Sequence, residues 1–450
     1  MNIMPTLTRQ IKLQIVGDKE EKDRVWKQLR EGIEAQSRAM NKYMSGLYVT
    51  MMSDAGEEER KELSHLYGRM PTSNKGSAYT EDFQFFKGLN SVSSLCMRVK
   101  KDFNNAMKKG LKYGRVSLPS YKKDFPLLIH VDYIKLRKLS RIDDGIYHNY
   151  QSHTEFLEHL YKTDLEVLIK FANQVTFKMV FGNPHKSRFL REEIKNIFEE
   201  NYQVQGSSIQ IKDKDIILNL CMDVPKREVK LKEDVALGVD LGVVNPATCA
   251  INDDNDKWHS WNFIGDGIGF QQQRYKFKEQ RRRIQKNIKY MTRGGHGRNK
   301  KINCLNKIKA KEKNFAKTFN HNISKQIVDL AVKNQAAVIQ LEDLSNYRPK
   351  SEKDETKKKL LGVWGYYQLQ QDIEYKAASY GIKVKYVNPA YTSKICSFCG
   401  EIGKRTPEDR DHFYCQNEKC EKYNIVLNAD WNAARNIAFS TDYIEKNIKE

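Results

Sequence analysis

The 450-residue sequence lacks any uninterrupted apolar run of about 18 residues, the length that a membrane-spanning helix needs. It also shows no lipidation signal, and its first stretch, MNIMPTLTRQIKLQIVGDKEEKDR, is too polar for a secretory signal peptide. These absences argue against an integral or anchored membrane protein. We therefore expect a cytoplasmic protein with no membrane partner.

A disulfide framework is also missing. Four of the eight cysteines, Cys96, Cys221, Cys249 and Cys304, are scattered singly along the chain. In a reducing compartment such cysteines are ordinary thiols. Only the remaining four stand in close pairs.

Acidic residues are too few to balance the basic ones. The chain has 78 Lys and Arg against 57 Asp and Glu, a formal net charge of +21, which indicates a polyanionic partner. Residues 271–313 hold sixteen Lys or Arg against only Glu279 and Glu312. The aromatic residues Tyr275, Phe277 and Tyr290 are interleaved with them. Such a run can neutralise phosphates and offer stacking faces to bases. The alternative is a soluble helical hairpin without a partner, and nothing in the run distinguishes RNA from DNA.

Changes in hydrophobic period divide the chain. The stretch RQIKLQIV alternates like a half-buried strand, and a long helical pattern follows, with Asp18 and Glu21 in capping-box spacing. Short strands and hairpins, VSLPSY among them, are expected from residue 116 to 232, interrupted by one helix, RFLREEIKNIFEE. We interpret them as a small β-barrel that the first strand completes. From residue 233 strands alternate with helices, so the fold class is multi-domain α+β with a C-terminal α/β domain.

Three carboxylates stand where such charges are costly. Asp240 lies in the apolar stretch LGVDLGV, Glu342 ends the strand pattern AAVIQLE, and Asp430 begins the last helix. Taken singly, each has an ordinary structural explanation. Asp240 would be a turn residue, Glu342 a charge that meets solvent at a strand end, and Asp430 the N-cap of a helix. If the two strands are neighbours and the helix packs beside them, the carboxylates converge and need cations. Two catalytic Mg²⁺ ions fit, because Mg²⁺ takes oxygen ligands and serves phosphodiester hydrolysis.

The paired cysteines have metal-ligand spacing. Cys396-x-x-Cys399 and Cys415-x-x-x-x-Cys420 supply four thiolates, which predicts one structural Zn²⁺, with two disulfides as the poorer alternative. The second pair is spaced more widely than the usual two residues. The insert lies between the second and third acids, so its basic side chains could hold a DNA strand near the metals. Alternatively, the zinc knot only caps the domain.

Several motifs, in order, resemble those of a known nuclease family. GVDLGVVNPA, FAKTFNHNISKQIVDLA, VIQLEDLS, YTSKICSFCG and NADWNAARNIA look like the split RuvC-like nuclease of the TnpB and type V CRISPR lineage. LPSYKKDFPL, TRGGHGR and the short chain are most similar to the miniature type V-F effectors. The resemblance covers most of residues 230–450, and the N-terminal half only in layout.

The resemblance implies roles for particular residues. The catalytic, Mg²⁺-binding acids would be Asp240, Glu342 and Asp430. An arginine between the two cysteine pairs would lie near the scissile phosphate, and Arg405 is our candidate, with Arg410 as the alternative. The cysteine insert would be a zinc ribbon that binds the target nucleic acid.

The resemblance also implies an architecture. An N-terminal wedge/OB-like β-barrel would carry an inserted helical recognition module, followed by an RNase H-like (RuvC) α/β nuclease domain with the zinc-ribbon insert. The expected boundaries are 1–18 and 116–232 for the barrel, 19–115 for the helical module, 233–392 and 424–450 for the nuclease domain, and 393–423 for the ribbon.

The activity implied is that of an RNA-guided DNA endonuclease in prokaryotic CRISPR defence. A guide RNA would pair with target double-stranded DNA next to a short flanking motif, and a single RuvC-like site would cut the DNA. A homodimer on one guide RNA is implied, because so small a chain has little surface to enclose the heteroduplex. The alternatives are a transposon-encoded TnpB-like nuclease and a catalytically silent, zinc-containing nucleic-acid-binding regulator. The presence of all three acids argues against the regulator.

Overall fold

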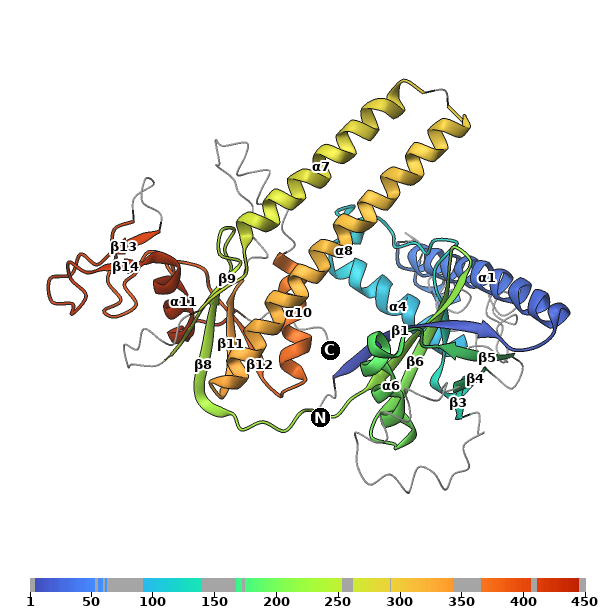
Figure 1. The fold of residues 1–450 in the computed structure, drawn as a ribbon, viewed down its shortest axis with the longest axis horizontal. Coiled ribbons are helices and arrows are strands. Elements are labelled where there is room, and N and C mark those ends of the chain that lie inside the picture. Colours follow the sequence, from blue (N-terminus) through green and yellow to red (C-terminus); the bar gives the residue numbers. More distant parts are fainter. Residues whose placement is uncertain are drawn as a thin grey trace. The chain divides into compact units, whose positions relative to one another are not determined.

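The computed structural model (Figure 1) describes residues 5–52, 56–59, 61–62, 92–138, 167–171, 175–252, 262–291, 293–343, 366–405 and 411–444. The chain forms two compact units. The N-terminal unit is Thr6–Val224, and the C-terminal unit is Pro225–Glu450 together with Met1–Pro5. None of the helices in the described ranges has the length and apolar character to cross a membrane.

The N-terminal unit is built on a seven-stranded antiparallel sheet in the order β2-β6-β7-β1-β5-β4-β3. The strands are β1 (Thr6–Ile15), β2 (Leu127–Ile129), β3 (Ile134–Lys138), β4 (Val167–Phe171), β5 (Val175–Val180), β6 (Gln203–Lys212) and β7 (Asp215–Asp223). The first strand thus shares a sheet with strands that follow residue 116. The edge strands β2 and β3 do not pair with each other in the described part of the chain, so the closed barrel is not confirmed.

The strand expected at VSLPSY is wrong. Residues 116–121 have no strand structure, and the backbone of Tyr121 pairs instead with a helix side chain. The Asn41 side chain accepts a hydrogen bond from the Tyr121 N–H at 2.7 Å and donates one to the Tyr121 carbonyl at 2.8 Å. Pro119 also has no N–H to give to a ladder. The segment is therefore tied to a helix rather than to the sheet.

Helices of this unit follow the predicted periodicity. They are α1 (Lys19–Met52), α4 (Val92–Lys108) and α6 (Pro184–Phe198), and the last of these matches the expected helix RFLREEIKNIFEE. Asp18 caps α1, because its Oδ1 accepts a hydrogen bond from the Glu21 N–H at 2.8 Å. The helix buries Leu29, Met40 and Tyr43 against the rest of the unit. The helical pattern expected over 63–91 lies outside the described residues.

The C-terminal unit contains a mixed five-stranded sheet in the order β10-β9-β8-β11-β12. The strands are β8 (Lys232–Asp240), β9 (Ala247–Ile251), β10 (Asn262–Ile264), β11 (Ala336–Glu342) and β12 (Lys383–Val387). Strands β8, β11 and β12 run parallel, whereas β9 and β10 are antiparallel to their neighbours. The mixed α/β architecture predicted for this half is confirmed.

A tight turn joins the first two strands of this sheet along the chain. The stretch VALGVDLGVVNPATCAI turns back on itself between β8 and β9. A Cβ atom at Gly242 would lie only 2.6 Å from the Asn245 carbonyl oxygen, so the turn needs glycine there. This turn brings Asn245 back toward the end of β8.

Successive residues of β8 point to opposite faces of the sheet. Leu237 and Val239 belong to the hydrophobic core that includes Ile323 and Ile327 of helix α8 (His296–Lys333). Gly238 faces the other way, where a Cβ would collide with the backbone of helix α11 (Ala429–Phe439) at Ala434 and Ala438. Glycine therefore allows α11 to pack directly on β8. Asp240, two residues on, points to the same side as Gly238.

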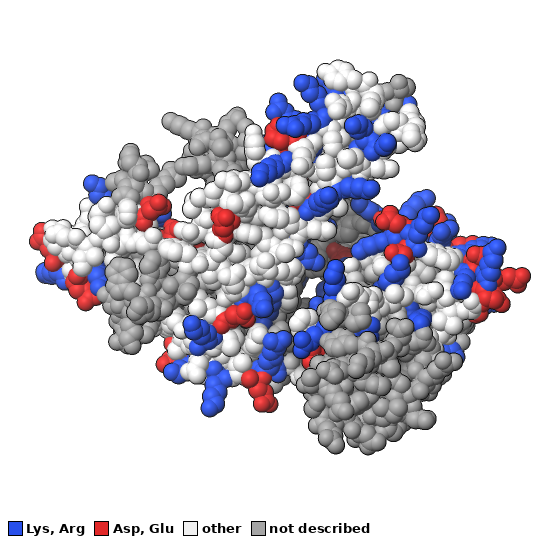
Figure 2. Space-filling model, in the orientation of Figure 1, with Lys and Arg blue, Asp and Glu red and all other residues white. Residues whose placement is uncertain are grey.

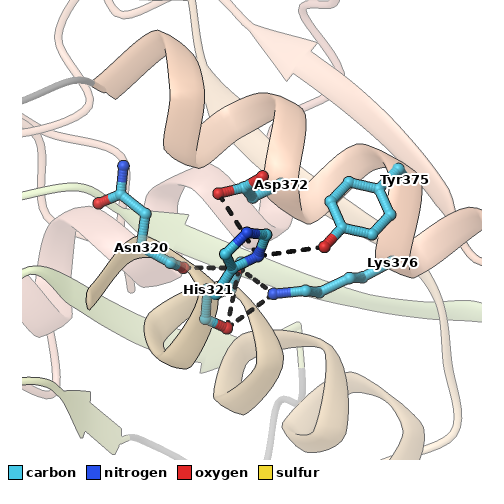
Figure 3. Close-up of polar contacts among 6 residues, drawn as sticks. Asn320, His321, Asp372, Tyr375 and Lys376 are labelled. Atoms are coloured by element: carbon cyan, nitrogen blue, oxygen red, sulfur yellow. Dashed lines mark hydrogen bonds and ion pairs between the residues drawn. The ribbon is translucent and has the colours of Figure 1, made fainter. Parts of the chain in front are cut away.

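A polar cluster joins α8 to helix α10 (Tyr366–Ala378), as Figure 3 shows. The Lys376 ammonium donates to the His321 carbonyl at 2.7 Å and to the Ser324 hydroxyl at 2.6 Å. Burial lowers the pKa of Lys376 to about 8, and the Asp372 carboxylate opposes this shift. The cluster fixes α10 against α8.

The basic run folds as a helical hairpin. Helix α7 (Gly267–Lys289) and the first half of α8 run side by side in opposite directions and extend beyond the sheet (Figure 1). We call residues 267–317 the basic arm. At its base Phe270 stacks on Phe315 and Phe319, with centroids 5.4 and 4.2 Å away.

Glu312 holds the two helices of the basic arm together. Its carboxylate is buried and lies 3.0 Å from Arg274 Nε and 3.3 Å from Arg281 Nε, both on α7. Glu312→Gln would leave two arginines without their counter-charge, so we expect the arm to lose about 2 kcal/mol of local stability. Amide hydrogen exchange in α7 should accelerate more than tenfold.

Glu279→Gln is the matched control. Glu279 also lies in the basic arm, but its ion pair with Arg282 spans 3.7 Å on one helix surface. Ion pairs at such a solvent-accessible position contribute little, because Arg282 is exposed and Glu279 only half-buried, so exchange in α7 should stay within about twofold of the unmodified chain. Equal exchange in both variants would remove the clamp role of Glu312.

Candidate active site and metal centre

Adjacent strands bring two of the three acids together. Asp240 ends β8 and Glu342 ends β11, and these parallel strands pair with Leu341 opposite Val239. The next position in this register sets Glu342 beside Asp240. The carboxyl ends of two neighbouring strands therefore present two carboxylates at one edge of the sheet, as predicted.

The third acid comes from α11. Asn428, not Asp430, is the N-cap: its side chain accepts a hydrogen bond from the Trp431 N–H at 2.9 Å. The alternative that Asp430 caps the helix is therefore wrong. The Asp430 carboxylate instead accepts a hydrogen bond from Asn245 Nδ2 at 3.1 Å and lies 3.6 Å from an Arg405 guanidinium nitrogen.

Electrostatics link the three acids. Burial raises the pKa of Asp240 well above its ordinary value, and the negative charges of Glu342 and Asp430 raise it further. The positive charge of Arg405 opposes this shift. Burial also raises the pKa of Glu342. A bound cation would relieve both the burial cost and the mutual repulsion of these carboxylates.

Glu342 is held by neighbouring polar groups. The Thr392 hydroxyl lies 2.5 Å from Glu342 Oε1 and counteracts the rise in the pKa of Glu342. Gln370 of α10 donates to the Glu342 carbonyl at 3.0 Å. Neither Thr392 nor Asn245 was identified from the sequence, although each lies within a motif noted above, YTSKICSFCG and GVDLGVVNPA respectively. Their position within these two motifs is the one sequence feature that could have identified them.

Arg405 lies at the acids, as proposed from the sequence. Its side chain contacts Asp430, and its charge acts on Asp240. Arg410, the alternative, lies outside the described residues. Within the described chain, Arg405 is therefore the arginine that joins the cysteine insert to the acidic cluster.

The four paired cysteines form one cluster. The sulfur atoms of Cys396, Cys399, Cys415 and Cys420 all lie within 4.8 Å of one another. The sulfur of Cys399 is 3.6 Å from that of Cys415, the sulfur of Cys396 is 3.9 Å from that of Cys420, and none of these cysteines forms a disulfide. Four sulfurs around a tetrahedral Zn²⁺ with bonds of about 2.3 Å would stand about 3.8 Å apart, so the donor set fits zinc.

The wider second spacing does not loosen this cluster. Cys420 reaches the first pair nearly as closely as Cys415 does, because a turn at residues 417–420 closes with a hydrogen bond from the Cys420 N–H to the Asn417 carbonyl at 2.9 Å. In the described part of the chain, these cysteines alone form a group of three or more potential metal-ligating Cys, His, Asp or Glu side chains. The three acids are related by their electrostatic interaction, not by such tight packing.

The cysteine insert leads directly into helix α11, which carries Asp430. Strand β13 (His412–Tyr414) pairs with β14 (Val426–Asn428), and β14 runs into α11 without a break. Phe413 is fully buried beneath the cysteines. The fold of the insert therefore determines where α11 begins, and with it the place of Asp430.

Comparisons with known proteins agree with this architecture. A family model described as "Cas12f1-like, TNB domain" matches residues 366–437, and one described as "Probable transposase" matches residues 219–348. The CRISPR-associated endodeoxyribonuclease Cas12f1 of Sulfoacidibacillus thermotolerans is 32% identical over 80% of this chain and 79% of its own length. The chain belongs to the Cas12f1 family. The predicted kinship with miniature type V-F effectors is thereby confirmed.

Other relatives extend the similarity. A Cas12f1 of an uncultured archaeon is 27% identical over 88% of this chain and 80% of its own length. A TnpB-like protein of Methanocaldococcus jannaschii is 34% identical over 30% of this chain and 45% of its own. A solved Cas12f1-sgRNA-target DNA complex contains a chain with a TM-score of 0.64 at 21% identity, covering 94% of this chain and 83% of that one. The last similarity concerns the fold.

Proposed function

We propose that this Cas12f1 family member is an RNA-guided DNA endonuclease whose single active centre is formed by Asp240, Glu342 and Asp430. The observation that carries the assignment is the convergence of these acids from β8, β11 and α11 beside Arg405. A binding module would have no use for three mutually repelling carboxylates, one of them with a strongly raised pKa. The silent regulator is therefore disfavoured.

The acids are proposed to hold two Mg²⁺ ions. Hard carboxylate oxygens at the end of a sheet suit this ion, which keeps positions open for water and phosphate oxygens. When bound, the metal would supply the chemistry of phosphodiester hydrolysis, which is activation of a water and stabilisation of the leaving 3′ oxygen. Asn245 orients the Asp430 carboxylate, and Arg405 supplies a positive charge for the scissile phosphate.

The zinc-ribbon insert is proposed to bring the target strand to the acids. It carries Lys394, Lys404 and Arg405, and Arg405 already lies against Asp430. A single structural Zn²⁺ at the four cysteines would keep this loop folded. We propose that residues 393–423 form this insert, and that β14, which pairs with β13, connects it to α11.

The partners are proposed to be a guide RNA and target double-stranded DNA. The chain's net charge of +21 suits contacts with a heteroduplex backbone. The basic arm is the densest source of that charge, and Figure 2 shows Lys and Arg along it. Its two acids, Glu279 and Glu312, are both engaged in ion pairs with arginines of α7. The exposed basic residues between residues 271 and 313 are Lys276, Lys278, Arg282, Arg283, Lys286, Lys289, Arg293, Lys300, Lys307, Lys309, Lys311 and Lys313.

Neutralising one stripe of the basic arm should weaken RNA binding. Arg283, Lys286 and Lys289 are exposed and spaced three apart on α7. With all three changed to Gln, we expect guide RNA affinity to fall at least tenfold. The slope of log K against log salt should decrease by about 0.7–0.9 for each phosphate that the arm no longer neutralises. Filter binding across a salt series measures both quantities.

A variant with the same loss of charge elsewhere in the unit provides the control. Lys325 and Lys333, on α8 beyond the basic arm, and Lys383 on β12 are also exposed. Changing these three to Gln should leave the salt slope nearly unchanged. Equal losses in both triple variants would mean that net charge, and not the arm, governs RNA binding.

Sequencing the RNA that co-purifies with the chain tests the class of the nuclease. We expect an RNA with a repeat-derived segment and a variable spacer. An RNA derived from a transposon end would favour the TnpB-like alternative, and the absence of bound RNA would contradict guidance.

We also propose a homodimer on one guide RNA, which mass photometry of the same complex would show as two chains per RNA.

A further inference from the structure

Thr392 is a buried residue that contacts the acidic cluster. It lies between β12 and the first cysteine pair, and only 6% of its surface is exposed. Its hydroxyl oxygen is 2.5 Å from Glu342 Oε1 and 3.2 Å from the Pro389 carbonyl oxygen. A hydroxyl has one proton to donate, and the shorter contact to an ionised carboxylate is the stronger one. The hydroxyl therefore restrains one oxygen of Glu342.

The backbone around Thr392 is fastened to α11. The Asn436 side chain donates to the Thr392 carbonyl at 2.7 Å and to the Ile395 carbonyl at 2.9 Å. One turn earlier, Asn432 donates to the same Ile395 carbonyl at 2.8 Å and accepts from the Ser397 N–H at 2.9 Å. Two side chains on one face of α11 thus hold the segment that carries Thr392.

The residue before Thr392 adopts an unusual backbone conformation. Tyr391 has φ of 66°, in the left-handed region that residues other than glycine rarely occupy. Its carbonyl accepts hydrogen bonds from the Lys394 N–H at 2.8 Å and the Ile395 N–H at 3.1 Å. Strain of this kind persists where surrounding contacts fix the chain, and it is common beside functional sites. Here it sets the direction in which Thr392 enters the acidic cluster.

We propose that Thr392 is a positioning residue that fixes the Glu342 carboxylate relative to α11, and so relative to Asp430. This inference rests on the proposed function. Thr392 restrains one oxygen of Glu342, and the other oxygen would then be the one that binds a cation. Because the same segment is fastened to the helix that carries Asp430, β11 and α11 are held in one arrangement at the metal site. Groups that orient metal ligands in this way typically contribute 10–100-fold to metal affinity or activity.

Thr392→Val and Thr392→Ser test the proposal. Valine keeps the size but removes the hydroxyl, whereas serine keeps the hydroxyl. In the guide complex without DNA, Mn²⁺ affinity measured by electron paramagnetic resonance should fall about tenfold in the valine variant and stay within about threefold in the serine variant. With DNA and saturating Mg²⁺, the valine variant should cut 10–100-fold more slowly with unchanged DNA affinity and zinc content.

Several outcomes would overturn the role of Thr392. These are a valine variant that binds Mn²⁺ and cuts like the unmodified chain, and equal losses in the valine and serine variants. Should the valine variant not fold, Thr392→Ala, which is smaller, takes its place under the same criteria. Glu342→Gln separates the positioning role from the active-site assignment. If it still cuts, the active-site assignment fails, whereas an inactive Glu342→Gln beside a normal Thr392→Val contradicts only the positioning role.

Discussion

Asp240→Ala is expected to abolish Mg²⁺-dependent DNA cleavage, with a rate at least about a thousandfold below that of the unmodified chain, while guided DNA binding survives. Burial raises the pKa of Asp240 well above its ordinary value, and the charges of both other carboxylates raise it further. Removing it deletes a central ligand of the proposed cation site. It does not touch the basic arm or the N-terminal unit, from which nucleic-acid affinity would mainly come. Single-turnover cleavage and equilibrium DNA binding, measured on the same guide complex, separate the two effects.

Asp234→Ala is the matched control for Asp240→Ala. Asp234 lies on the same strand, β8, and its side chain is exposed. Its removal changes the net charge by the same amount but leaves the acidic cluster intact, so cleavage should stay within about twofold. Wild-type cutting by Asp240→Ala, or an equal loss in Asp234→Ala, would refute the active-site assignment.

Cys415→Ser is expected to remove the bound zinc, from about one ion per chain to nearly none, and to reduce cleavage at least tenfold. The cysteine cluster closes the insert over Phe413, and the insert leads through β14 into α11. Loss of the metal would therefore release both Arg405 and the beginning of the helix that bears Asp430. Metal analysis by mass spectrometry gives the zinc content, and cleavage assays on the same preparation give the activity.

Cys304→Ser controls for the loss of a thiol as such. Cys304 is a single exposed cysteine on α8, distant in sequence from the cluster. This variant should retain its zinc and full cleavage. A Cys415→Ser protein that keeps stoichiometric zinc would exclude the four-cysteine site. One that loses zinc but cuts normally would show that the insert only caps the domain.

The acids and cysteines could be proposed as site residues because short sequence patterns around them indicate their chemistry. Asp240 and Glu342 each end an apolar strand, and the cysteines stand in two pairs at ligand spacing. Parallel pairing of β8 with β11 then brings the two acids together without further assumptions. Gly238 belongs to the motif GVDLGVVNPA that contains Asp240. In the structure, its lack of a side chain allows α11 to approach β8 closely.

Features that depend on distant contacts could not be predicted in this way. The VSLPSY segment alternates like a strand, but the Asn41 side chain of α1 takes the backbone groups of Tyr121 that a ladder would have used. Closure of a barrel depends on whether edge strands such as β2 and β3 pair with each other. The hydrophobic periodicity within a single strand does not predict such pairing. Thr392 likewise gains its place at Glu342 only when the insert docks on α11.

Guide-dependent cleavage is the most direct test of the central claim. The chain, loaded with one guide RNA, would be incubated with duplexes that carry the matching sequence beside a randomised flanking segment, and with duplexes that do not match. We predict cleavage of matched duplexes with a subset of flanking sequences, in Mg²⁺ and not in a chelator. Cleavage of matched and unmatched duplexes alike, cleavage in the chelator, or stable guided binding of matched DNA without any cleavage in Mg²⁺ would contradict it.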